Sequence, residues 1–361
     1  MKKKPLKNVP VPVDQPGPEE WRKLYEAAGK VKEMAPWNWM MEDEVFGVQN
    51  PETGETGYVS VMGHLGEHLG ISVYMGDVAL YKFFDLEDAA DDEEMEEGPM
   101  TAMLLLEIPQ LQASFEDREL LDKDDLAVIK QLGLKFRGPQ AWPQFRAMQP
   151  AMLPWYITAA EARYLTCVLE QLPDVALRFD DDDELLYPDD ADGFLIRVAR
   201  EENGARVWED VIRQVPRPEP APIRLNTNMA LLEKVSGFRQ VSRDLEMELM
   251  MMPMPTADKG QRPCFPYLLM IVDETSGMIV KTDLMAPTPS LEAMWGDVPN
   301  RMMSTIEQLG AIPGVVRVRS SLLMGLLQPL SLELGFQLKH ADELPALDEA
   351  MDMLMDSPMF N

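Results

Sequence analysis

The run Tyr267-Leu268-Leu269-Met270-Ile271-Val272-Asp273-Glu274-Thr275-Ser276-Gly277 decides the fold of the C-terminal part of this chain. Its first six residues are apolar without a break, which is typical of a strand that is buried on both faces. The following Glu274 to Gly277 has the composition of a turn, and the β-type segment 278–285 comes directly after it. The run therefore predicts a buried strand that turns back into an antiparallel neighbour.

Segments on either side of this pair extend it into a larger sheet. Three further β-type segments surround it, at 245–252, 315–319 and 336–339. Helical patterns lie between and after them, and they start near Ser290, Ser321 and Pro345. The first helix carries one apolar stripe from Leu291 to Leu309, so we expect it to be continuous. The resulting order β-β-β-α-β-α-β-α predicts a mixed sheet covered by helices.

The N-terminal half combines shorter elements of both kinds. Amphipathic helices are predicted from Pro18, from Asp77 and over 159–172. Strands are predicted at 45–49, 58–62, 71–74, 101–108, 194–199 and 206–212. The first two strands flank a turn-rich segment and so favour a hairpin. This mixture predicts an α+β region rather than a second copy of the C-terminal pattern.

Composition divides the chain into four parts. Residues 1–18 carry five prolines and few apolar side chains, so we expect a disordered tail. Alternating prolines at 216, 218, 220 and 222 favour extended geometry and mark a linker over 216–226. The predicted domains are an N-terminal α+β region over 19–215, with two lobes divided near 110–125 as an option, and a C-terminal mixed-sheet α/β domain over 227–361.

The charge balance excludes several classes of partner. The chain has 62 Asp and Glu against 33 Lys and Arg, which gives a net charge of −29. Such a surface repels phosphates, so we expect neither nucleic acid nor an anionic membrane as a partner. No apolar run approaches the length of a membrane span. Cys167 and Cys264 lie far apart in the sequence and are predicted to be free thiols. Because free thiols are typical of a reducing compartment, we expect a cytoplasmic location.

One literal metal motif occurs, His64-Leu65-Gly66-Glu67-His68, which has the H-x-x-E-H spacing of a zinc hydrolase. That chemistry needs both imidazoles on one face of a helix, with the glutamate beside them. Glycines interrupt the segment at 63, 66 and 70, and β-type runs flank it. We therefore predict a loop that carries no zinc, with a zinc hydrolase as the alternative.

Two tryptophans are candidates for a binding groove. Trp37 and Trp39 lie in an aromatic-rich segment that can line a peptide or ligand groove, and core packing is the alternative interpretation. Phosphate-binding, dinucleotide-binding and hydrolase-elbow motifs do not occur in the sequence. We accordingly predict no cofactor and no metal site.

The chain resembles an uncharacterised bacterial family of unknown function. The N-terminal likeness rests on residues 21–39, 46–54, 58–63 and 66–76. The C-terminal likeness, to what looks like a companion domain of that family, rests on residues 262–273, 289–295 and 344–350. The resemblance covers most of the chain and implies no known activity.

The C-terminal domain is also distantly similar to the ribonuclease-H-like cores of transposases and retroviral integrases. Tyr267 to Gly277 looks like their second strand and turn. The resemblance implies two magnesium ions held by acidic residues, for which Glu248, Asp273 and Glu349 are the candidates here. A further acid is missing, because Ser320 or Ser321 stands in its place after Arg319.

These observations favour a non-catalytic binding or scaffold protein. Its partner is a protein or a small ligand that the sequence does not specify. The alternative is a metal-dependent phosphodiesterase or nuclease-type enzyme with a degenerate ribonuclease-H-like site built from Glu248, Asp273 and Glu349.

Overall fold

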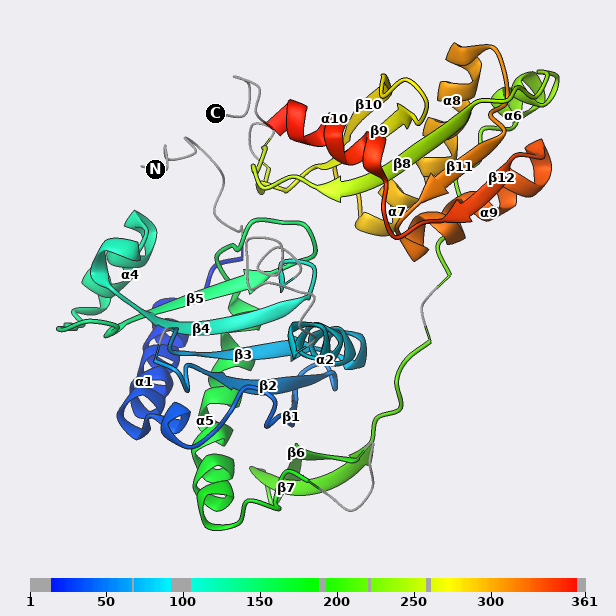
Figure 1. Cartoon of the computed structure of the whole chain (residues 1–361). Helices are drawn as coiled ribbons and strands as arrows, with labels where there is room; N and C mark the ends of the chain where they lie inside the picture. Colours follow the sequence, from blue (N-terminus) through cyan, green and yellow to red (C-terminus); the bar gives the residue numbers. More distant parts are fainter. Residues whose placement is uncertain are drawn as a thin grey trace. The chain divides into compact units, whose positions relative to one another are not determined.

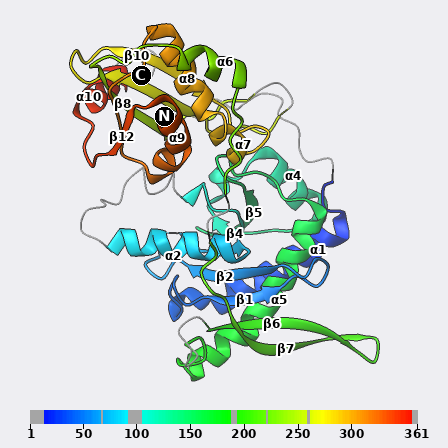
Figure 2. The same ribbon diagram turned by 90° about the vertical axis from the view of Figure 1, so that its right-hand side faces the viewer.

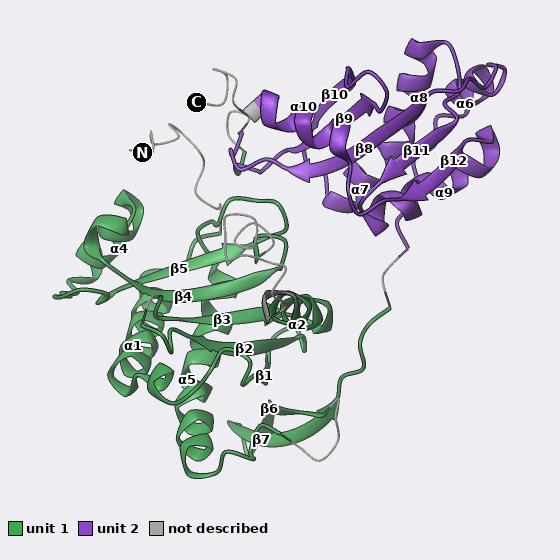
Figure 3. Ribbon diagram, in the orientation of Figure 1, with its two compact units in different colours: residues 1–219, 258–262 green, residues 220–257, 263–361 purple. Residues whose placement is uncertain are grey.

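The computed structural model describes residues 14–66, 68–91, 105–187, 193–219, 222–257 and 261–355. The chain forms two compact units (Figure 3). Unit 1 comprises Met1–Glu219 and Asp258–Arg262, and unit 2 comprises Pro220–Ala257 and Pro263–Asn361. The division falls inside the proline-rich segment 216–226. Most of the predicted N-terminal tail lies outside the described residues.

Unit 1 is built on a seven-stranded sheet in the order β5-β4-β3-β2-β1-β6-β7 (Figure 1). Neighbouring strands are antiparallel, except that β1 and β6 are parallel. The strands are β1 (Phe46–Gln49), β2 (Thr56–Met62), β3 (Gly70–Met75), β4 (Gln110–Glu116), β5 (Trp142–Met148), β6 (Gly193–Glu202) and β7 (Ala205–Gln214). Because β4 pairs with both β3 and β5, the sheet is continuous through the region 110–125.

Helices cover both faces of this sheet (Figure 2). They are α1 (Pro18–Met34), η1 (Pro36–Asn38), α2 (Asp77–Asp91), η2 (Arg118–Leu120), α4 (Lys123–Leu132) and α5 (Ala159–Asp181). Strand side chains alternate between the faces. Val59 and Val73 therefore join the core under α1 and α5, whereas Tyr58 and Tyr74 join the core under α2. The α+β class predicted for this half is confirmed.

Helix α5 is longer than the sequence pattern predicts. The predicted helix ends at Leu172, because Pro173 lacks the N–H that would bond to the carbonyl of Leu169. In the structure the helix continues through Pro173 to Asp181. Val175 and Phe179, in the added turns, are buried in the core. Their burial outweighs the loss of one backbone hydrogen bond.

The strand predicted at 101–108 is wrong over its described part. Leu105 is helical, the next residues form a turn, and strand β4 begins only at Gln110. Residues 101–104 lie outside the described ranges. A short apolar run has no alternation, so its pattern does not separate a strand from a helix or turn.

Unit 2 contains a five-stranded mixed sheet in the order β10-β9-β8-β11-β12. Strands β8, β9 and β10 are antiparallel, and β8, β11 and β12 are parallel. The strands are β8 (Asp244–Met251), β9 (Tyr267–Asp273), β10 (Ile279–Met285), β11 (Val315–Val318) and β12 (Gln337–His340). All residues of β9 are buried, as its apolar run predicts. The kinship with ribonuclease-H-like cores stays a prediction.

The helices of unit 2 lie around this sheet. They are α6 (Met229–Ser236), α7 (Leu291–Trp295), α8 (Val298–Leu309), α9 (Ser321–Leu334) and α10 (Pro345–Met355). Helix α10 packs on the face that carries Met270 and Val272. Leu269 and Ile271 point to the other face and are also fully buried. Among the described helices of both units, none combines the length and apolar character needed to cross a membrane.

The helix predicted over 291–309 is two helices. It is broken at Gly296, where a Cβ atom would lie 2.4 Å from the carbonyl oxygen of Arg224. The backbone N–H of Asn226 donates to the carbonyl of Gly296 over 2.9 Å, so another segment crosses the helix at this point. Pro299 then occupies the first turn of α8, a position at which a helix start tolerates proline.

Candidate functional site

Strand β8 places acidic residues on the face of the sheet that α10 covers. Asp244, Glu246 and Glu248 alternate along the strand, so their side chains project to one face. Arg317 on β11 is the register partner of Glu246 and projects to the same face. The sequence therefore builds a layer of mixed charge between the centre of the sheet and α10.

Glu246 is only 2% exposed. Its Oε2 accepts a hydrogen bond from the backbone N–H of Leu347 over 2.7 Å. Leu347 lies in the first turn of α10, where backbone N–H groups have no partner within the helix. Burial raises the pKa of Glu246, and this hydrogen bond acts in the opposite direction. The carboxylate thereby fixes the start of α10 on the sheet.

Glu248 lies two residues further along β8 and is 8% exposed. It accepts a hydrogen bond from the N–H of Leu249 over 3.0 Å. Burial raises the pKa of Glu248, which the positive charge of Arg319 partly offsets. Arg319 itself makes a two-point contact with Asp348 on α10, with both distances 2.8 Å.

Arg317 lies between two further carboxylates. Its Nη1 is 2.6 Å from Glu274 Oε2 and 3.2 Å from Asp244 Oδ2. Guanidinium groups thus stand among the carboxylates of this layer and neutralise charge that a pair of divalent metal ions needs. The described ranges contain no group of three or more His, Cys, Asp or Glu suited to hold a metal ion.

Asp273 projects away from this layer. Its register partner is Leu245, which points to the opposite face from Glu248 and lies about 10 Å further along the strand. Asp273 Oδ1 accepts from the N–H and the hydroxyl of Ser276, and Oδ2 pairs with Arg243 Nε at 2.8 Å. Burial opposes these contacts, but together they lower the pKa of Asp273. The residue stabilises the β9–β10 turn.

Glu349 lies on the exposed side of α10 and faces a groove of about 380 Å³. The lining comes from the β9–β10 turn, the start of β10 and one flank of α10. It consists of Ser276, Gly277, Ile279, Ala346, Glu349, Ala350, Met353 and Leu354. The structure thus places Glu248, Asp273 and Glu349 in three different surroundings and does not bring them together.

The H-x-x-E-H segment lies in the loop that joins β2 to β3. His64 is in a turn, and its Nδ1 lies 3.1 Å from the carbonyl oxygen of Trp37. His68 Nδ1 lies 3.9 Å from Glu116 Oε1. Glu67 lies outside the described residues. The two imidazoles therefore contact different partners, and their surroundings are those of a loop rather than one helical face.

Trp37 and Trp39 pack into unit 1. Trp37 is 6% exposed, and its ring centroid lies 5.5 Å from that of Phe115. The indole N–H of Trp39 donates to the carbonyl of Ala176 on α5 over 3.0 Å. These contacts match the packing alternative of the sequence analysis.

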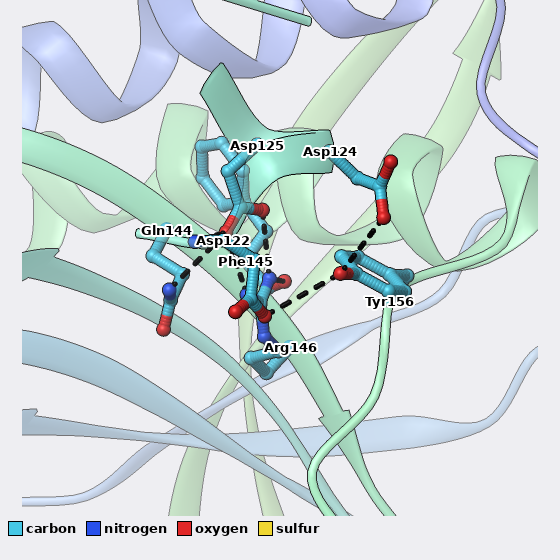
Figure 4. A network of polar contacts seen from close by, with 7 residues as sticks. All are labelled: Asp122, Asp124, Asp125, Gln144, Phe145, Arg146 and Tyr156. Atoms are coloured by element: carbon cyan, nitrogen blue, oxygen red, sulfur yellow. Dashed lines mark hydrogen bonds and ion pairs between the residues drawn. The ribbon is translucent and has the colours of Figure 1, made fainter. Parts of the chain in front are cut away.

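Unit 1 contains a polar network that the sequence analysis missed (Figure 4). Arg146 on β5 is 8% exposed and contacts both carboxylate oxygens of Asp125, at 2.9 and 2.7 Å. It also reaches Asp122 at 3.2 Å, and its guanidinium lies 4.8 Å from the ring centroid of Tyr156. Asp122 and Asp125 form a capping box at the start of α4. The spacing of these two aspartates was the available sequence signal.

The two halves of the chain match two family models. Residues 21–197 match a model described as a domain of unknown function (DUF7309), and residues 231–355 match another described as a domain of unknown function (DUF6930). No curated protein matches the chain. The matches confirm the predicted resemblance to uncharacterised sequences, and neither description names an activity.

Proposed function

We propose that this protein is a non-catalytic binding protein and that unit 2 carries its binding surface, in the groove beside α10. The observation that carries the proposal is the contrast between two sets of carboxylates. Glu246 is engaged with the start of α10 inside the unit, whereas Glu349 faces an accessible groove.

The layer beneath α10 supports a structural role for its charges. Glu246 holds the helix start, Arg319 holds Asp348 on the same helix, and Arg317 is paired with Glu274. A catalytic metal centre requires carboxylates that are free to face the metal and a substrate. Here the carboxylates face guanidinium and backbone N–H groups instead.

The lining of the groove supports a binding role. Ile279 and Met353 in its lining are 44% and 66% exposed, and neighbouring Met278 is 69% exposed. Clustered exposed apolar side chains mark surfaces that bind another molecule. The single carboxylate among them, that of Glu349, can orient a bound ligand but does not make a catalytic centre.

Methyl NMR of methionine-labelled full-length protein tests the binding role. The ε-methyl signals of Met278 and Met353 report on the groove, and the signal of Met285, which is 5% exposed, serves as the control. Ligand candidates drawn from peptides and small amphiphiles are expected to move the first two signals only. Failure of every class to move them would contradict the proposal.

A metal titration tests the enzymatic alternative. We expect Mg²⁺ and Mn²⁺ to leave the melting temperature unchanged and to support no hydrolysis of bis(4-nitrophenyl) phosphate. Metal-dependent stabilisation that disappears in both Glu248→Gln and Glu349→Gln would replace the binding role by the nuclease-type alternative.

We also propose a cytoplasmic location and no nucleic-acid partner. Cys167 and Cys264 remain free thiols, which suits a reducing compartment. The net charge of −29 opposes contact with phosphates. Retention on DNA or heparin at about 150 mM salt would contradict the second statement.

A further inference from the structure

We infer that the groove beside α10 receives an amphipathic helix of a partner protein, with a Lys or Arg side chain placed against Glu349. The inference rests on the proposed binding role of unit 2 and adds the class of partner. It is carried by the uncovered part of the sheet, the interrupted edge of β10 and the unequal charge on the two flanks of α10.

Helix α10 covers only part of its face of the sheet. It contacts β8 and β9, whereas β10 is the outermost strand. The register places Ile279, Thr282 and Leu284 of β10 on the α10 face, because they pair with Val272, Met270 and Leu268. Ile279 and Leu284 are 44% and 62% exposed. This strip of β10, with one exposed apolar side chain on either side of Thr282, therefore faces solvent beside α10.

The flank of α10 that borders this strip suits a second helix. Ala346, Ala350 and Met353 line the groove at spacings of four and three residues, which is the period of one helix face. Ala350 is 4% exposed and belongs to the core of unit 2, so it offers little contact surface, but together with the small side chain of Ala346 it leaves room for the side chains of a neighbouring helix. The flexible thioether of Met353 can adapt to the side chains that it meets.

The free edge of β10 is less suited to an added strand. The register shifts between Ile279 and Lys281, so a bulge interrupts the strand at Val280. Lys281 further along donates to Ser304 on α8 over 3.1 Å. Bulges and charged side chains are the usual means by which a sheet edge resists pairing with another chain. The sheet face, rather than the edge, is the available surface.

The two flanks of α10 differ in charge compensation. On one flank Asp348 is paired with Arg319 at 2.8 Å. On the groove side, Glu349 has no ion pair with any side chain in the described ranges, and it is exposed. A Lys or Arg side chain of a partner would compensate Glu349 in the way that Arg319 compensates Asp348. The net charge of −29 attracts such a partner over a distance.

The test uses the full-length protein and a designed peptide of about 15 residues, long enough to form a helix on a surface. The peptide carries leucines on one face and two arginines beside them, and a fluorophore reports binding by anisotropy. Leu284→Asp and Ile279→Asp are expected to weaken binding by about tenfold or more. Leu332→Asp, at a site on α9 that is 76% exposed, is the matched control and is expected to change nothing.

A charge exchange tests the predicted pairing. Glu349→Lys is expected to weaken binding, and a peptide with glutamate in place of one arginine is expected to restore it. A double-mutant cycle then gives a coupling of about threefold or more. Circular dichroism confirms that each variant is folded.

Three results would overturn the inference. They are equal affinity of wild type and Leu284→Asp, absence of coupling at Glu349, and tighter binding of an extended, β-branched peptide than of the helix. If the helix fails while another ligand moves the Met353 methyl signal, the inference is wrong and the binding role stands. If no ligand moves that signal, the binding role fails as well.

Discussion

Glu246, in the middle of β8, accepts a hydrogen bond from the backbone N–H of Leu347 in the first turn of α10 over 2.7 Å. A strand carboxylate thereby satisfies a helix terminus about one hundred residues further along the chain. The negative charge also lies at the positive end of the helix dipole. Glu248, which the resemblance offers as a metal ligand, thus lies two residues from Glu246, a carboxylate that has a structural role.

We expect Glu246→Ala to destabilise the attachment of α10 by about 2 kcal/mol, because the N–H of Leu347 loses its buried acceptor. Glu246→Gln keeps an acceptor oxygen and should cost less. Hydrogen–deuterium exchange of peptides from residues 345–355 measures the effect directly. Glu349→Gln, at an exposed position on the same helix, is the control and should leave the exchange unchanged.

Glu248 gives a prediction about pH. Burial raises its pKa above the ordinary 4.5, so the folded state binds a proton more tightly than the unfolded state. The stability that protonation of Glu248 gives to the folded state is therefore complete below pH 4.5, and it is lost as pH rises through the raised pKa of Glu248. Glu248→Gln should reduce this dependence, leaving the part of the same sign that comes from the raised pKa of Glu246, and should stabilise unit 2 at pH 7 by about 1 kcal/mol.

The measurement is urea unfolding of unit 2 within the full chain, at pH values from about 7 down to 4.5, followed by exchange of β8 and β9 peptides. The lowered pKa of Asp273 acts in the opposite sense, but its contribution is lost only as pH falls below its ordinary 3.8. A stability of unit 2 that decreases steadily from pH 7 to pH 5 would contradict the assignment.

The strands of unit 2 follow from local sequence. Residues 267–272 form an unbroken apolar run, and β9 occupies Tyr267–Asp273. The break at Gly296 does not follow, because it depends on the backbone of Arg224, which is distant in sequence. Periodicity describes which face of a helix is buried, but it contains no information about a segment that crosses that helix.

The candidate site, too, can be predicted from the sequence only in part. The acidic residues of β8 can be read from the sequence, since Glu246 and Glu248 alternate with apolar neighbours. Their surroundings cannot, because Leu347 donates to Glu246 through its backbone, and Arg319, whose charge acts on Glu248, directly follows another strand, β11. The groove beside α10 arises from tertiary packing of three segments and has no sequence signature.

Arg146 and Asp125 form a buried ion pair whose loss should be costly. Asp125→Asn removes the negative charge that compensates the buried guanidinium of Arg146. We expect this to destabilise unit 1 by about 3 kcal/mol. Asp124→Asn is a matched control one residue away, with a contact to the hydroxyl of Tyr156 at 3.2 Å. Its cost should stay below about 1 kcal/mol. Tryptophan fluorescence during urea unfolding measures both.

Gly57 on β2 should not accept alanine. A Cβ atom there would lie 2.3 Å from the hydroxyl oxygen of Tyr164 and 2.6 Å from Val73 Cγ1. The same hydroxyl donates to the carbonyl of Val48 over 2.7 Å, so the ring of Tyr164 cannot withdraw without breaking a buried hydrogen bond. We expect Gly57→Ala to destabilise unit 1 by about 2 to 3 kcal/mol.

Two further variants separate this steric effect from a general effect of alanine. Gly29→Ala lies in α1, where no atom beyond the neighbouring residues and the backbone of the helix itself comes within 4 Å of the added methyl group, and it should stabilise the helix by about 0.5 to 1 kcal/mol. In a Tyr164→Phe background the nearest obstacle to the Gly57 methyl is gone, although Val73 remains. The cost of Gly57→Ala should therefore fall by about 1 kcal/mol, and strict additivity of the two substitutions would show that Tyr164 does not hold this position.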